Sequence, residues 1–267
     1  MPARAFWKGY LKLSLVTCPV AMAPATSESD KVRFHTLNRA TGNRVLSQYV
    51  DSVSGKAVDE DDEVKGYERG RNEYVMLEDD ELDAVALDST RTIDIEMFVP
   101  RESIEWIWYD TPHYLTPNDP VGAEAFSVIR EAMQATGTVG ISRLVLYRRE
   151  RAVMLEPRDR GIVLWTLRYG DEVRDPVGYF AGIKPEKLEP QLVSLVSKLI
   201  EKKTVAWGPS LLGDPVQAQL LKLIAAKKKG KRPVKAKAPV ERPTNVVNIM
   251  DALRKSIAAD EKRPKGR

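Results

Sequence analysis

Few residues of this sequence could support nucleophilic or metal-based catalysis. Its 267 residues include one cysteine, Cys18, and two histidines, His35 and His113. A nucleophilic triad or a zinc site needs several such side chains to converge. Cys18 lies in an apolar stretch and His113 lies beside a turn in DTPHYL, so we interpret them as a buried, inert thiol and a structural histidine. The lone His35 indicates no site, and Gly55 has no neighbours that would make a phosphate-binding loop.

Two acidic runs are the remaining catalytic candidates. Residues 59–63 and 78–80 are rich in Asp and Glu and could hold two divalent metals, as nucleases do. Consecutive carboxylates on an irregular run point in divergent directions, however, and repel one another. We therefore favour solvated loops and expect no metal, no cofactor and no enzymatic activity. A metal-dependent nuclease that uses Asp61 and Asp62 is the alternative.

An arginine-rich segment is the body's one clear cationic region. Residues 143–168 contain seven arginines, no lysine and three acidic residues. Arginine binds phosphate in a bidentate manner and stays charged at any relevant pH. A single strand over 141–151 would place its arginines on one face, whereas a hairpin turning at 148–151 would crowd them at its tip. Salt bridges to the acidic runs are an equally weighted alternative for these candidate phosphate contacts, Arg143, Arg148, Arg149 and Arg151.

Charge is divided unevenly along the chain. The net charge of +4 conceals a C-terminal stretch, residues 222–267, with 15 Lys and Arg against 4 Asp and Glu, and a remainder with 27 basic and 34 acidic residues. A strongly basic tail favours contact with a polyanion. The candidate contacts in this tail are Lys227, Lys228, Lys229, Lys231 and Arg232. No zinc finger, recognition helix or RNA-binding motif accompanies them, so binding without sequence preference is expected.

The elements that must position these residues change type along the chain. The sequence pattern predicts strands at 10–16, 32–37, 73–77, 92–99, 141–147, 152–155 and 162–169, and no internal repeat is evident. Turn signals at 41–43 and 54–56, with 45–50 between them, predict a hairpin-like excursion. A helix is predicted after Pro120, ending at Gly137, with apolar residues on one face. Helical periodicity resumes after Pro185. We therefore predict a mainly β, α+β fold: an antiparallel barrel or sandwich with a helical appendage.

The first 25 residues admit two interpretations. Basic residues precede an apolar stretch and Ala21-Met22-Ala23, as in an export signal. Pro19 interrupts that stretch, however, and Leu11, Leu13 and Leu15 alternate with polar residues, so a half-buried strand is favoured. One cysteine excludes an intramolecular disulfide. No apolar run approaches a membrane span, and a cytoplasmic, nucleoid-associated protein is expected.

Several ordered motifs resemble one family. WKGYLKLSLVTCPV, VRFHTLNRATGNR, VKGYE, STRTIDIEMFVP, YDTPHYLTPND, EAFSVIREAM and RRERAVMLEPR follow one another over residues 7–158, and NVVNIMDALRKSI lies near the C-terminus. Together they resemble the bacterial Ku proteins, the DNA-end-binding factors of non-homologous end joining. The resemblance implies a homodimeric ring of two β-barrels with an extended bridge over double-stranded DNA, which recruits the ATP-dependent DNA ligase D.

The resemblance also implies a division of the chain. Residues 1–184 would form the barrel, with the bridge at about 31–71; 185–226 would be a helical dimerisation arm; 227–243 a flexible linker; and 244–267 an amphipathic segment with a basic tail. The bridge would supply the DNA contacts Lys31, Arg33, Arg39, Arg44 and Lys56. Leu188, Leu192, Leu195, Val196 and Leu199 would form the dimer contact, and Val246, Ile249, Met250, Leu253 and Ile257 would recruit the ligase.

Three rival functions remain open at this point. A nucleoid-coating protein would hold duplex DNA through its basic tail and would bind closed circles and free ends equally. The metal-dependent nuclease would cleave DNA with magnesium. An exported protein would lack residues 1–23 in its mature form.

Overall fold

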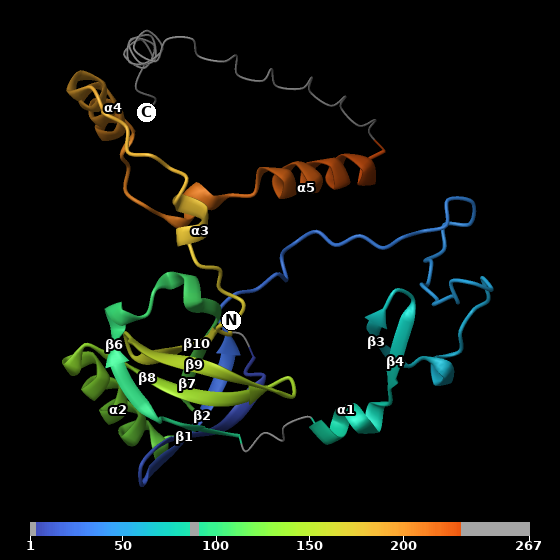
Figure 1. Cartoon of the computed structure of the whole chain (residues 1–267), viewed down its shortest axis with the longest axis horizontal. Helices are drawn as coiled ribbons and strands as arrows, with labels where there is room; N and C mark the ends of the chain where they lie inside the picture. Colours follow the sequence, from blue (N-terminus) through green and yellow to red (C-terminus); the bar gives the residue numbers. More distant parts are fainter. Residues whose placement is uncertain (1–3, 86–90, 231–267) are drawn as a thin grey trace. The chain divides into compact units, whose positions relative to one another are not determined.

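The computed structural model of the chain describes residues 4–85 and 91–230. The chain forms two compact units, Met1–Asp30 with Phe34–Asp175, and Lys31–Arg33 with Pro176–Arg267. The first unit contains the main sheet and the second contains helices (Figure 1). Within the described residues, no helix is long and apolar enough to cross a bilayer.

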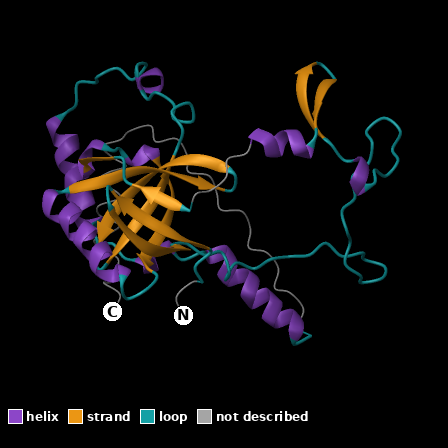
Figure 2. Ribbon diagram, turned by 90° about the horizontal axis from the view of Figure 1, so that it is seen from below, coloured by secondary structure: helices purple, strands orange, loops and turns teal. Residues whose placement is uncertain are grey.

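The main sheet has eight strands in the order β5-β1-β2-β7-β10-β9-β8-β6. Neighbours are antiparallel except for β1 and β5, which are parallel. Figure 2 shows that the sheet is strongly curled. The strands are β1 (Trp7–Leu13), β2 (Val16–Pro24), β5 (Thr92–Asp94), β6 (Met97–Pro100), β7 (Tyr109–Pro117), β8 (Thr138–Leu146), β9 (Arg149–Arg158) and β10 (Gly161–Leu167).

The two edge strands of this sheet are consecutive in the chain. Between β5 and β6, the Ile95 amide donates to the Lys12 carbonyl at 2.9 Å, and the Glu96 amide donates to the Ile141 carbonyl at 3.0 Å. The chain thus passes directly from one edge of the sheet to the other, which joins the edges and removes the problem of exposed strand edges. The strand predicted over 92–99 is therefore divided into β5 and β6. Of the two predicted architectures, the barrel is confirmed and the sandwich is not.

The barrel encloses one apolar core. Strand residues such as Leu11, Leu155 and Leu164 are completely buried in it. The helix α2 (Gly122–Thr136) adds three further side chains to the core, Phe126, Ile129 and Met133. This helix confirms the predicted apolar face, and it ends as predicted at Gly137, whose φ of 64° gives a left-handed C-cap.

The N-terminal stretch forms a hairpin, not one strand. Leu13 pairs with Val16, so Ser14 and Leu15 make the turn between β1 and β2. Ser14 has a φ of 55°, and Leu15 is 97% exposed. The strand interpretation of this stretch is confirmed, but the inward position predicted for Leu15 is wrong because the chain reverses at Ser14.

The chain between β2 and β3 is irregular. The strand predicted over 32–37 is absent from it, and only single bridges join Leu37 to Arg44 and Val50 to Ala57. The chain then forms η1 (Glu60–Asp62), the hairpin of β3 (Lys65–Gly70) and β4 (Glu73–Leu77), and α1 (Asp79–Val85). Short helices η2 (Arg101–Ser103) and η3 (Trp106–Trp108) precede β7.

The second unit is helical. It contains α3 (Val177–Phe180), α4 (Pro190–Lys203), η4 (Pro209–Leu212) and α5 (Pro215–Lys228). Asp214 caps α5 by accepting hydrogen bonds from the amides of Val216 and Gln217, at 2.8 and 3.1 Å. The helices predicted between 185 and 226 are present. Neither α4 nor α5 contains a buried residue, so their apolar side chains are not used to build a core.

Candidate nucleic-acid interface

The irregular segment contains two turns of the same construction. Asn38 and Asp51 each accept a hydrogen bond from the amide two residues on, at 2.9 and 3.1 Å. Their carbonyls accept from the amides of Gly42 and Gly55, at 2.8 and 2.9 Å. Both glycines have positive φ, 74° and 69°, which favours glycine in each turn. The stretches L-N-x-x-T-G and V-D-x-x-S-G thus form the same kind of turn with different side chains.

The second of these turns is also stabilised electrostatically. The hydrogen bonds from Ser54 and Val53 lower the pKa of the Asp51 carboxyl, the Ser54 amide having the largest effect. The turn therefore keeps its charged acceptor at neutral pH and would lose it only as the pH falls below the ordinary Asp value of 3.8.

These turns present cations of the predicted bridge to solvent. Arg39 follows Asn38 in the first turn, Arg44 closes it, and Lys56 follows the glycine of the second turn. All three side chains are exposed, and none forms an ion pair with another described residue. Lys31 and Arg33 are exposed too, but they belong to the second unit.

The arginines of the barrel are placed differently. Arg143 pairs with Glu150 at 3.1 Å, and Arg148 pairs with Asp83 of α1 at 2.5 Å. Arg151 lies 3.7 Å from Asp110, its guanidinium 5.4 Å from the centre of the Tyr169 ring. Three of the four candidates therefore form salt bridges, but the predicted partners in the acidic runs are mostly wrong. Glu150 and Asp110 belong to the barrel, and only Asp83 lies at the end of the second acidic stretch. Arg149 makes no ion pair with any residue that the structure describes.

Of the two geometries predicted for these arginines, the hairpin is correct, but the predicted position of its turn is wrong. Leu146 pairs with Arg149, and Leu144 pairs with Arg151. The turn thus consists of Tyr147 and Arg148 alone, and Arg149 and Arg151 lie within β9. The predicted hairpin exists, but its turn lies earlier in the chain.

A buried carboxylate that the sequence analysis missed connects three elements. Glu156 of β9 accepts hydrogen bonds from Arg101 Nε at 2.6 Å, Arg158 at 2.9 Å and Trp165 Nε1 at 3.2 Å. The hydrogen bond to Glu156 is the main reason that the pKa of Arg101 is raised. A single acidic residue inside the apolar run VMLEP was the available signal, because a buried charge requires partners.

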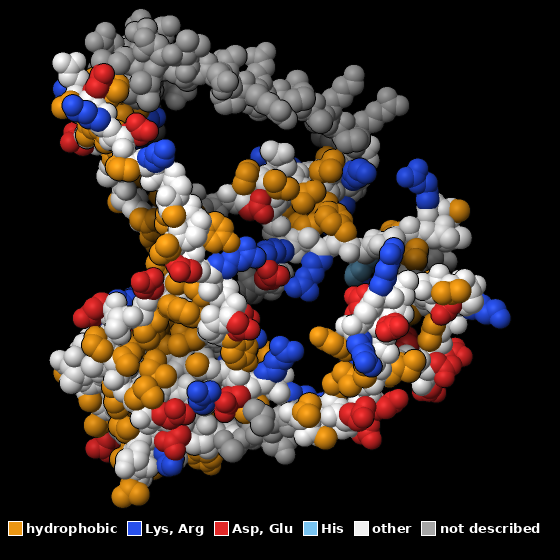
Figure 3. Space-filling model, in the orientation of Figure 1, with side chains coloured by type: hydrophobic (Ala, Val, Ile, Leu, Met, Phe, Trp, Pro, Cys, Tyr) orange, Lys and Arg blue, Asp and Glu red, His pale blue; other side chains and the backbone are white. Residues whose placement is uncertain are grey.

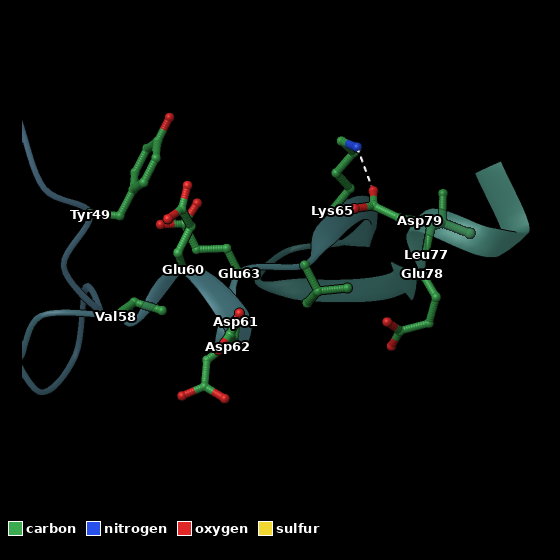
Figure 4. Close-up of a pocket in the computed structure, with 11 residues that line it drawn as sticks. Tyr49, Val58, Glu60, Asp61, Asp62, Glu63, Lys65, Leu77, Glu78 and Asp79 are labelled. Atoms are coloured by element: carbon green, nitrogen blue, oxygen red, sulfur yellow. Dashed lines mark hydrogen bonds and ion pairs between the residues drawn. The ribbon is translucent and has the colours of Figure 1, made fainter. Parts of the chain in front are cut away.

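The acidic runs do not form a metal site. Within the described ranges, no group of three or more His, Cys, Asp or Glu side chains is arranged to hold a metal ion. Residues of both runs line one open pocket, and in Figure 4 the side chains of Asp62 and Glu78 leave the ribbon on the opposite side from that of Glu60. Figure 3 shows acidic side chains gathered at the surface over the part of the chain that carries the β3–β4 hairpin and α1. The runs are exposed, as expected, but they are not simple loops, because Glu60–Asp62 form η1 and Asp79 and Asp80 begin α1.

The thiol and the histidine of the barrel are structural. Cys18 is completely buried, its Sγ lies 3.7 Å from the Leu11 carbonyl, and burial raises the pKa of its thiol. His113 is buried beside the Phe6 ring, and burial lowers the pKa of its imidazole. A raised thiol pKa opposes formation of the nucleophilic thiolate, as expected for an inert cysteine.

The predicted dimer residues lie in the second unit, and the predicted tail residues lie partly outside the described residues. Leu192, Leu195, Val196 and Leu199 lie on α4, partly or fully exposed, and Leu188 is exposed just before this helix. Lys227 and Lys228 end α5, and Lys229 is its C-cap. Lys231, Arg232 and the predicted ligase-recruiting residues Val246, Ile249, Met250, Leu253 and Ile257 lie outside the described residues.

Comparison with known proteins identifies the family. The family model for the Ku70/Ku80 beta-barrel domain matches residues 12–206, which include the whole barrel from β2 onward. The chain belongs to the Ku family. The non-homologous end joining protein Ku of Methylocella silvestris is 65% identical over 274 residues and covers 100% of both chains.

More distant Ku proteins match over similar lengths. The Allorhizobium ampelinum protein is 60% identical, covering 99% of this chain and 98% of its own. The Coxiella burnetii protein is 33% identical, covering 99% and 98%. Both bear the name non-homologous end joining protein Ku. The predicted family and Ku barrel are therefore confirmed.

Proposed function

We propose that this Ku chain binds the ends of double-stranded DNA in non-homologous end joining, as a homodimer that closes around the duplex. The observation that carries the proposal is its 65% identity, over both full lengths, to a protein named for that process. A repair factor must accept any broken end. It is therefore expected to contact phosphates and groove shape, and not base edges.

The unpaired cations of the bridge support phosphate binding. Arg39, Arg44 and Lys56 have no acidic partner among the described residues to displace, whereas Arg143, Arg148 and Arg151 of the barrel pair with carboxylates. We therefore assign the main electrostatic contact to the bridge, about residues 31–71, and a secondary one to Arg143, Arg148, Arg149 and Arg151.

The apolar side chains of the helical unit support a second copy as partner. Leu188, Val193 and Ile200 are exposed in or beside α4, and Figure 3 shows apolar side chains at the surface of α5. Apolar side chains left uncovered in a helix are typical of protein interfaces. We propose that residues 185–226 form the dimer contact, between the barrel of residues 1–184 and the C-terminal segments 227–243 and 244–267.

The C-terminal residues complete the proposal. Residues 227–243 would act as a linker, and the apolar positions between 246 and 257 would recruit ATP-dependent DNA ligase D. Deletion of residues 228–267 should flatten the dependence of DNA affinity on salt, by about 0.9 in logarithmic slope per lost phosphate contact, without removing the preference for ends. An unchanged slope would limit the tail to partner binding.

Competition between linear and closed circular DNA of one sequence tests the proposal. A ring can pass over an end but cannot enclose an uninterrupted circle, so linear duplex should compete far better. The mass in solution should be that of a dimer. Equal competition by circles would instead favour a nucleoid-coating protein, and cleavage that depends on magnesium and on Asp61 and Asp62 would favour a nuclease.

A further inference from the structure

The tip of the β8–β9 hairpin has an uncommon backbone. Tyr147 and Arg148 form its two-residue turn, and both have positive φ, 52° and 64°. Turns of this kind favour Asn and Gly, because a Cβ atom is crowded in the left-handed region. A bulky aromatic side chain there is unfavourable for folding, and such outliers cluster where a function requires them.

The turn holds the Tyr147 ring at the surface on an aromatic support. The side chain is 83% exposed. Its ring is parallel to that of Phe6, with 1° between the planes and 6.5 Å between the centroids. The Phe6 ring in turn lies 5.5 Å from the buried His113 ring. The protein thus presents an exposed aromatic ring with a second, parallel ring beside it.

Cationic side chains accompany this surface. Arg149 forms no ion pair with any residue in the described part of the chain. Arg148 pairs with Asp83, and both side chains remain more than half exposed, at 62% and 57%, so a phosphate could replace the carboxylate at little cost. An aromatic ring can stack on the base of a nucleotide, and a neighbouring cation can bind the phosphate of the same nucleotide.

We infer that Tyr147 stacks on the last base of a DNA end while Arg148 and Arg149 contact phosphates of the same strand. This inference rests on the proposed function and adds a contact that recognises the end itself. Inside a duplex, neighbouring pairs cover both faces of every base. Only the terminal base, or one in an overhang, offers a free face, and stacking accepts any base.

Fluorescence of 2-aminopurine, which falls when the base stacks, tests the contact. The probe is placed in a one-nucleotide 3′ overhang of a linear duplex, or ten pairs inside the same duplex. The full-length protein should quench the overhang probe and leave the internal probe unchanged. Tyr147→Phe keeps the ring and should keep the quenching.

Tyr147→Asn separates stacking from folding. Asn tolerates the left-handed conformation, so this variant should unfold at a higher temperature than the unchanged protein. It should nevertheless lose the quenching and bind ends at least about fivefold more weakly, with an unchanged salt slope. Arg149→Gln, by contrast, should lower the slope by about 0.9.

The possible failures are distinct. If linear DNA outcompetes circles but the overhang probe is not quenched, or is still quenched by Tyr147→Asn, the stacking inference is wrong and the proposed function stands. If circles compete as well as linear DNA, the proposed function and the inference both fall.

Discussion

The barrel and the bridge use charge in opposite ways. Several arginines in and beside the barrel are held by carboxylates: Arg101 and Arg158 by the buried Glu156, Arg143 by Glu150, and Arg151 by Asp110. On the bridge, Arg39, Arg44 and Lys56 have no such partner among the described residues and extend from hydrogen-bonded turns. An arginine-rich sequence alone therefore does not locate a phosphate-binding surface. The presence or absence of acidic partners distinguishes the cations that we propose as the main phosphate contacts from the others.

The two regions also differ in how they are stabilised. The barrel buries a continuous apolar core that includes α2, whereas the bridge is exposed almost throughout and depends on local hydrogen bonds. Mutations in the barrel should therefore affect the free energy of unfolding, and mutations in the bridge should affect DNA binding.

A pair of leucine truncations should give the largest contrast. Leu164→Ala removes a completely buried side chain and should lower the free energy of unfolding by about 2–5 kcal/mol. Leu46→Ala, at a position 82% exposed on the bridge, should change it by less than about 0.5 kcal/mol. Urea denaturation measures both, and equal losses would show that the bridge packs against something.

The buried carboxylate should give the next largest effect. Glu156→Gln removes the charge that accepts hydrogen bonds from two arginines and Trp165, and should cost about 1–3 kcal/mol. Glu150→Gln, in an exposed pair with Arg143, should cost at most about 1 kcal/mol. Thermal and urea unfolding of the two variants compare them, and similar losses would contradict a special role for Glu156.

Removal of charge should show different contributions of the bridge cations and the barrel cations to the salt dependence of DNA affinity. Replacing Arg39, Arg44 and Lys56 with Gln should lower the logarithmic salt slope of affinity by up to about 2.7, with unchanged stability. The same replacement of Arg143, Arg148 and Arg151 should lower it less, because phosphate must displace their carboxylates. Titrations of linear duplex at several salt concentrations measure both, and a larger effect in the barrel would reverse the assignment.

Protonation of the buried histidine should have the smallest effect on the free energy of unfolding, and this effect should be confined to the barrel. Burial lowers the pKa of His113 from its ordinary 6.5, although backbone hydrogen bonds to Leu164 and Thr111 and the Asp110 charge oppose this. Below pH 6.5 the unfolded chain therefore binds a proton that the folded barrel does not, so the free energy of unfolding should fall from there to the lowered pKa. Above pH 6.5 His113 contributes no dependence. Urea unfolding between pH 7.5 and 5 measures this, and His113→Gln should flatten the slope.

Much of the fold followed from local patterns. The alternation in β1, the apolar face of α2 and its end at Gly137 were predictable because they depend on residues a few positions apart. The irregular 32–37 segment was mistaken for a strand, because alternation persists there without a partner to complete a ladder. The predicted positions of turns were wrong where residues adopt positive φ against their preference, as Ser14 and Tyr147 do.

By itself, the sequence determined a β-rich fold, the absence of an intramolecular disulfide and the uneven distribution of charge, because composition and short-range periodicity encode these features. The family, and with it the barrel, was indicated by the resemblance of its ordered motifs. Tertiary structure alone decided which arginines are neutralised. Arg148 meets Asp83, and Arg101 meets Glu156, across 65 and 55 positions of the chain. Strand register and turn geometry bring such partners together, and neither is contained in the spacing of charges along the sequence.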